Sequence, residues 1–94
     1  MDDGEEMIWE HVVEAGVIRK RVGRSKSTGV LLIEAVCDAC GREIETNFYD
    51  DDGTLSKRTL YEYDDERRPK LVLGYDRNGK LVWRQERGKR PEQF

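Results

Sequence analysis

Both cysteines of this 94-residue chain lie in one short segment, VCDACGREIET, at positions 36–46. Cys37 and Cys40 are separated by two residues, and Gly41 follows them directly. Thiolates at this spacing suit a tetrahedral zinc ion, and the glycine allows a tight turn in which backbone N–H groups approach the sulfur atoms. The segment therefore predicts one half of a structural zinc site.

The second half of that site is missing from the sequence. CDACG is similar to a knuckle of the zinc-ribbon family, in which a second Cys-x-x-Cys follows about 15–20 residues later. At that distance the chain has LSKRTLYEYDD, without cysteine or histidine. Four alternatives stay open: a metal-free turn held by packing, a zinc shared between two subunits, a site completed by His11 and a carboxylate, and a labile disulfide. We expect the metal-free turn and no cofactor, with zinc at Cys37 and Cys40 as the alternative.

Catalytic chemistry has little support in the sequence. His11 is the single histidine, so any histidine general base must be this residue. Ser25, Ser27 and Ser56 do not occur in a Gly-x-Ser-x-Gly nucleophile pattern. We therefore expect a protein that is not an enzyme.

Five basic residues fall between positions 19 and 26: Arg19, Lys20, Arg21, Arg24 and Lys26. Cations clustered at a hairpin tip can neutralise phosphates of a nucleic acid. They can equally keep an edge strand solvated and free of aggregation. The second interpretation is favoured because the formal net charge is −3 and no aromatic residue interrupts the basic run.

Length and composition indicate one small domain spanning residues 1–94. Hydrophobic residues make up 36% and charged residues 39% of the chain, and the apolar residues come in short alternating runs. The N-terminus is acidic, and no segment approaches the ~20 apolar residues of a membrane span. Two cysteines three positions apart cannot form a disulfide framework. These features predict a soluble, cytoplasmic protein with no membrane partner.

Alternation of apolar residues predicts strands over residues 17–22 and 30–37, joined by the loop GRSKSTG. Residues 5–15 fit both a short helix and a strand, because their apolar positions satisfy either period. Residues 1–6 and 87–94 are predicted to fray.

The second half of the chain contains a short internal repeat. YDDDGTL and YDRNGKL share the pattern Tyr-Asp-x-x-Gly-x-Leu, and YDDERRPKL is a looser copy. A three-residue loop over 77–79, with Gly79 in the left-handed conformation, would place Tyr75 opposite Leu81 and Leu73 opposite Trp83, so that four apolar side chains share one face.

The same rule applied to the first copy pairs Tyr49 with Leu55 and Ile44 with Leu60. These two pairs lie on opposite faces, which predicts a β-bulge or a sheet partly covered on both faces.

The repeat units resemble the YD repeats of bacterial RHS proteins and teneurins over residues 47–86. In those families the repeats are β-hairpins that spiral into large shells. Here successive tyrosines are spaced by 14 and 12 residues in at most three units, too few for a shell. The resemblance implies a β-meander and carries no active-site residue.

The sequence as a whole predicts an all-β fold, a small antiparallel β-meander of about five or six strands with room for one short N-terminal helix. The predicted function is a non-catalytic binding module that acts through a protein partner or a homodimer. The alternative is a zinc-stabilised nucleic-acid-binding protein that uses the basic residues at positions 19–26.

Overall fold

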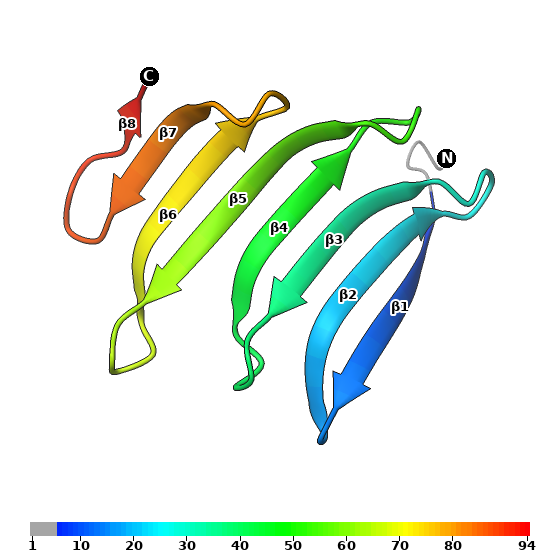
Figure 1. Cartoon of the computed structure of the whole chain (residues 1–94), viewed down its shortest axis with the longest axis horizontal. Helices are drawn as coiled ribbons and strands as arrows, with labels where there is room; N and C mark the ends of the chain where they lie inside the picture. Colours follow the sequence, from blue (N-terminus) through cyan, green and yellow to red (C-terminus); the bar gives the residue numbers. More distant parts are fainter. Residues whose placement is uncertain (1–5) are drawn as a thin grey trace.

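The computed structural model describes residues 6–94, so most of the predicted N-terminal fraying lies outside the described residues. The described chain is one antiparallel sheet of eight strands whose spatial order follows the sequence (Figure 1). The strands are β1 (Met7–Glu14), β2 (Val17–Ser25), β3 (Leu31–Cys37), β4 (Glu43–Tyr49), β5 (Leu55–Tyr63), β6 (Pro69–Asp76), β7 (Leu81–Glu86) and β8 (Glu92–Gln93). The predicted all-β meander is confirmed.

The predicted number of strands was too low, and residues 6–94 contain no helix. The segment left open between helix and strand forms β1, because its register with β2 pairs it residue by residue from Met7 to Val12. The tail contributes a further short strand, since Gln93 pairs with Trp83 and Glu92 with Arg84. No helix among the described residues could cross a membrane.

Four of the hairpin turns share one hydrogen-bonded form. Each begins at an aspartate, Asp38, Asp50, Asp64 or Asp76, whose N–H donates to the carbonyl four residues later and whose carbonyl accepts from the N–H three residues later. That third residue has a positive φ in every copy: 85° at Gly41, 86° at Gly53, 66° at Arg67 and 84° at Gly79. The prediction of a three-residue loop with left-handed Gly79 is confirmed.

The register of the β6–β7 hairpin was predicted only in part. Tyr75 lies opposite Leu81 as expected, but a register shift follows, so that Trp83 lies opposite Gly74 and Leu73 opposite Arg84. The predicted Leu73–Trp83 pair is therefore wrong. The indole needs the space above a residue without a side chain, which Gly74 provides and Leu73 does not.

The β4–β5 hairpin has the irregularity that the sequence required. Tyr49 pairs with Leu55, the register then shifts, and Leu60 lies opposite Glu45 instead of Ile44. Register shifts occur in six of the seven strand pairs, and each one adds local twist to the sheet.

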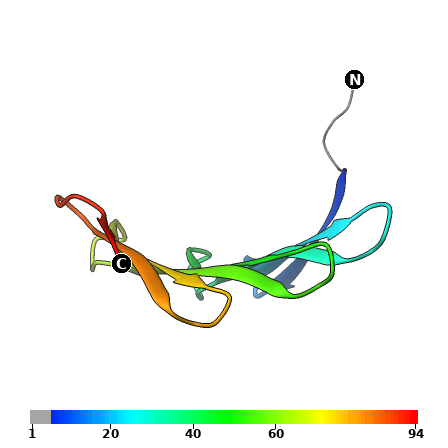
Figure 2. The same cartoon turned by 90° about the horizontal axis from the view of Figure 1, so that it is seen from above.

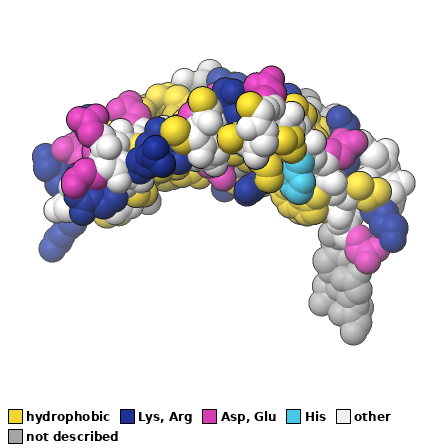
Figure 3. Space-filling model, turned by 90° about the horizontal axis from the view of Figure 1, so that it is seen from below, with side chains coloured by type: hydrophobic (Ala, Val, Ile, Leu, Met, Phe, Trp, Pro, Cys, Tyr) yellow, Lys and Arg dark blue, Asp and Glu magenta, His cyan; other side chains and the backbone are white. Residues whose placement is uncertain are grey.

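The molecule is an arched slab, one sheet thick (Figure 2). Ala35 and Cys37 are the only buried hydrophobic residues among those described. Hydrophobic side chains are visible on both the outer and the inner side of the arch, between charged ones (Figure 3). No second layer formed by residues 6–94 covers this sheet, so both of its faces are accessible in the described chain.

Candidate functional site

Alternation along the strands separates the side chains onto two faces. Cross-strand pairs share a face, so the row Trp9, Gly23, Ile33 and Phe48 defines one face, here called the tryptophan face. The row Glu10, Val22, Glu34, Asn47, Arg58 and Tyr75 defines the other, here called the network face.

Cys37 and Cys40 occupy a hairpin turn of the same kind as the other aspartate turns. Cys37 is buried, with 3% of its surface exposed, whereas Cys40 is exposed. The backbone N–H groups of Cys40 and Arg42 donate to Oδ1 of Asp38, both over 2.9 Å. The amides that would approach a thiolate in a zinc knuckle therefore already bind a carboxylate.

The turn explains why the cysteine spacing resembles a zinc knuckle. Cys37 holds the position that tyrosine has in the repeat, directly before the aspartate, and Gly41 holds the left-handed position. Cys-Asp-x-x-Gly is thus one more copy of Tyr-Asp-x-x-Gly, which the sequence comparison missed because cysteine replaces the aromatic residue.

His11 does not lie beside the cysteines. It is on β1 opposite Arg21, and β1 pairs with β2, not with the strand that carries Cys37. Among residues 6–94, no group of three or more His, Cys, Asp or Glu residues is placed to hold a metal ion.

Four of the five basic residues of the sequence prediction lie on the interior strand β2, and Lys26 lies in the hairpin turn that follows it. Lys20 and Arg24 project from the network face and Arg21 from the tryptophan face, according to their cross-strand pairs. Because β2 is hydrogen-bonded to strands on both sides, the favoured interpretation of the basic run as a solvated edge strand is wrong. The edge strand is β1.

Four of these five cations are paired with carboxylates. Lys20 Nζ lies 2.8 Å from Glu34, and the other three partners are on or next to β1: Arg19 with Glu14 at 3.1 Å, Arg24 with Glu10 at 3.2 Å and Lys26 with Glu6 at 3.0 Å. Arg21 makes no ion pair with the residues that the structure describes. The basic run therefore neutralises acidic neighbours and does not present one cationic patch.

The network face carries a hydrogen-bonded cluster centred on Asn47, of which only 3% is exposed. Its side-chain amide donates to Glu34 over 3.3 Å and to Glu45 over 2.9 Å, and its Oδ1 accepts from Arg58 Nε over 2.8 Å. The hydrogen bond from Lys20 lowers the pKa of Glu34, and the same contact raises the pKa of Lys20.

This cluster is chemically saturated. Throughout the described part of the chain, no buried side-chain nitrogen or oxygen lacks a hydrogen-bond partner. A network whose members satisfy one another holds β2, β3, β4 and β5 in register.

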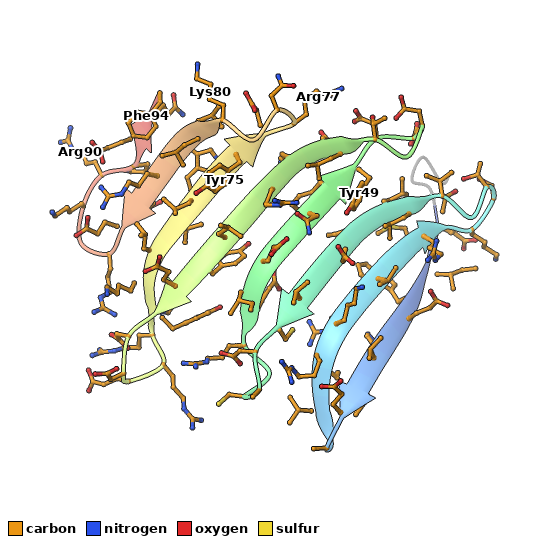
Figure 4. All side chains as sticks on the ribbon, viewed as in Figure 1. Tyr49, Tyr75, Arg77, Lys80, Arg90 and Phe94 are labelled. Carbon is orange, nitrogen blue, oxygen red and sulfur yellow. The ribbon has the colours of Figure 1, made fainter. Side chains whose placement is uncertain are left out.

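A shallow hollow of about 140 Å³ lies beside the cluster. Tyr49 and Tyr75 lie near the same end of the sheet, with Arg77 and Lys80 in the turn beyond β6 (Figure 4). The hollow is lined by Leu55, Arg58, Leu60, Tyr75, Asp76 and Gly79. It is smaller than the about 300–1,000 Å³ of typical small-molecule sites.

The most unusual surface is β1, which sequence analysis did not single out. All eight of its residues are exposed. Seven large hydrophobic residues are exposed in the described chain, and five of them are on this strand: Met7, Ile8, Trp9, Val12 and Val13. The sequence does contain an indication of this surface. In the segment MIWEHVVE, the alternation of a strand places apolar residues on both faces.

The backbone of β1 is also unpaired along its outer edge. Lys26 N donates to Glu6 O over 3.0 Å. In an antiparallel strand the N–H and C=O of one residue point to the same neighbour, and direction alternates along the strand. The backbone groups of Met7, Trp9, His11 and Val13 therefore point away from β2 and have no strand partner among the described residues.

No protein-family model matches the chain, and no curated protein matches it. Among solved structures, the GtfA/B complex bound to UDP and GlcNAc is similar, with a TM-score of 0.53 and 13% identity, over 100% of this chain and 24% of that one. TarM aligns with a TM-score of 0.37 and 11% identity, over 93% of this chain and 21% of that one. The chain thus spans between a fifth and a quarter of the length of these proteins, and the first likeness supports the fold alone.

Proposed function

We propose that this chain is a non-catalytic binding module whose open sheet associates with protein, either a different protein or a second copy. The observation that carries the proposal is the distribution of apolar residues. Two small hydrophobic residues are buried in the described chain, whereas the large ones on β1 remain exposed. Exposed apolar patches of this kind in soluble domains are typical of protein-binding surfaces.

The chemistry of the network face supports the same proposal. Its polar side chains hydrogen-bond to one another across neighbouring strands. The likeness to a segment of the GtfA/B chain assigns no glycosyl transfer to this protein, because so distant a similarity concerns fold only.

Site-specific photocrosslinking tests the proposal. A photoreactive phenylalanine analogue is placed at Val13, of which 57% is exposed, and in a matched variant at Lys89 in the turn after β7. Irradiation in the host cell should give one dominant adduct from the Val13 position and none from Lys89.

The adduct must then be reconstituted from purified components. We expect a stoichiometric complex that is weakened by Val13→Lys and unaffected by Lys89→Ala. If neither position crosslinks, or if the purified components do not associate, the proposed function is wrong.

A further inference from the structure

We infer that the open edge of β1 pairs with β1 of a second copy, joining two sheets into one continuous antiparallel sheet. This inference rests on the proposed function and specifies its partner. The groups that would make the contact are the outward N–H and C=O groups of Met7, Trp9, His11 and Val13, which have the spacing of an unfilled hydrogen-bond ladder.

Edge strands of monomeric proteins are normally protected by charge, proline or a covering loop. β1 has no proline, and its protecting carboxylates are already paired. Glu6, Glu10 and Glu14 are bound by Lys26, Arg24 and Arg19, at 3.0, 3.2 and 3.1 Å. Arg19, Arg24 and Lys26 thereby offset the negative charge that would keep a second strand away.

The opposite edge of the sheet excludes a head-to-tail arrangement. β8 has two residues, Glu92 and Gln93, and follows Pro91 and the basic residues Lys89 and Arg90. So short a strand cannot template the eight residues of β1. Two β1 edges are self-complementary about a two-fold axis, which closes the assembly as a dimer.

The longest overlap places the two-fold axis at Glu10. Met7 then lies opposite Val13 of the second copy and Trp9 opposite its His11, and all four outward residues of each strand exchange hydrogen bonds. Ile8 lies opposite Val12 on the network face. Glu10 lies opposite its own copy, and each of these carboxylates is held by its own Arg24.

Sedimentation equilibrium of the full chain tests the inference. The protein mass is 11.0 kDa, and we expect a monomer–dimer equilibrium for the wild type. His11→Pro should weaken the dimer at least about tenfold, because proline removes an N–H that points outward at two symmetric positions and spares the β1–β2 ladder. His11→Ala is the matched control and should dimerise as the wild type does.

Val13→Lys gives a second test if His11→Pro does not fold. Lysine on an edge blocks strand addition without removing a backbone hydrogen bond, and we expect the same weakening. A wild type that stays monomeric at about millimolar concentration would overturn the inference, as would an undiminished dimer in either variant.

A designed disulfide tests the register. In a background with Cys37→Ala and Cys40→Ser, Glu10→Cys should form an intermolecular disulfide under mild oxidation, because residues facing each other on the axis have Cα atoms about 4.5 Å apart. Glu14→Cys, equally exposed but distant from the axis, should not. Crosslinking at Glu14 and not at Glu10 would overturn the proposed axis.

The two proposals fail in different ways. A monomer whose Val13 photocrosslinks to a different protein, with a complex that can be reconstituted, would overturn the second copy as partner and support the binding function. A chain that neither dimerises nor crosslinks would overturn both.

Discussion

The indole of Trp83 lies directly over Gly74 on the neighbouring strand. A Cβ atom built at Gly74 would stand 2.0 Å from Trp83 Nε1, well inside van der Waals contact. Trp9 lies over Gly23 in the same way, where a Cβ would come within 3.2 Å of the indole and 2.7 Å of Ile33. Both tryptophans of the chain therefore cover a glycine on the same face of the sheet.

Gly74→Ala should lower the free energy of unfolding by about 1–3 kcal/mol, because the indole must move from its position. Chemical denaturation followed by circular dichroism measures the change. In a double-mutant cycle, Trp83→Val should remove most of the penalty of Gly74→Ala. An additive cycle would show that the two residues are not coupled as the structure indicates.

The four aspartate turns allow a matched comparison at one backbone position. Arg67 has a φ of 66° where the other copies have glycine. Arg67→Gly should therefore raise the free energy of unfolding by about 0.5–1 kcal/mol.

Gly79→Val should lower the free energy of unfolding by about 1–2 kcal/mol, because valine disfavours the left-handed backbone conformation. No atom lies within 4 Å of the position of its Cβ, so the cost comes from backbone strain alone. Thermal unfolding of both variants measures these effects, and equal signs would contradict the shared geometry.

Asp64 makes stability depend on pH in the acidic range. Hydrogen bonds from the backbone N–H of Arg68 and from the Arg87 side chain, at 2.6 Å, lower the pKa of Asp64 from 3.8 to about 2. A carboxyl group whose pKa is depressed in the folded state stabilises the fold above its unfolded pKa, and this contribution is lost as pH falls from about 4 to about 2.

Asp64→Asn should flatten the decrease in Tm between those pH values, as measured by thermal scans. Asp65→Asn is the control, because Asp65 accepts no hydrogen bond from the described residues. Equal pH profiles for wild type and Asp64→Asn would contradict this role for Asp64.

Dimerisation should not depend on zinc binding at Cys37 and Cys40. In the proposed dimer, five strand spacings separate β3 of one copy from β3 of the other, so their cysteines lie at least about 24 Å apart. We expect purified protein to contain no stoichiometric zinc by plasma emission, and a chelator or Cys40→Ser to leave both the Tm and the dimer unchanged. Half a zinc per chain, with loss of the dimer on chelation, would favour the shared metal site instead.

Local turn chemistry in this protein, and the register next to the turn, could be predicted from sequence, whereas the register beyond the bulge of the β6–β7 hairpin could not. The Asp-x-x-Gly pattern specified the turn at Gly79 because left-handed backbone favours glycine. The pairing of Leu73 failed because the position of a bulge depends on how Trp83 packs over Gly74, which is a contact between strands and not a property of the turn.

The candidate binding edge was hidden for a similar reason. The apolar residues of positions 8–15 satisfy both a helical and a strand period, and only pairing with the basic β2 decides between them. The nucleic-acid alternative rested on five cations, and the sequence did not show that three of them, Arg19, Arg24 and Lys26, are paired in the sheet with Glu14, Glu10 and Glu6.

The order of the strands has a consequence for how the chain folds. Each strand contacts only the strands before and after it in the sequence. Chains dominated by such local contacts close short loops and fold quickly. Their stability is close to a sum over neighbouring units, so hairpins can form in succession and open from either end. Pairing of β1 with a second copy would protect the β1 end of the sheet. Hydrogen exchange of the backbone amides in the dimer should then begin at the β8 end.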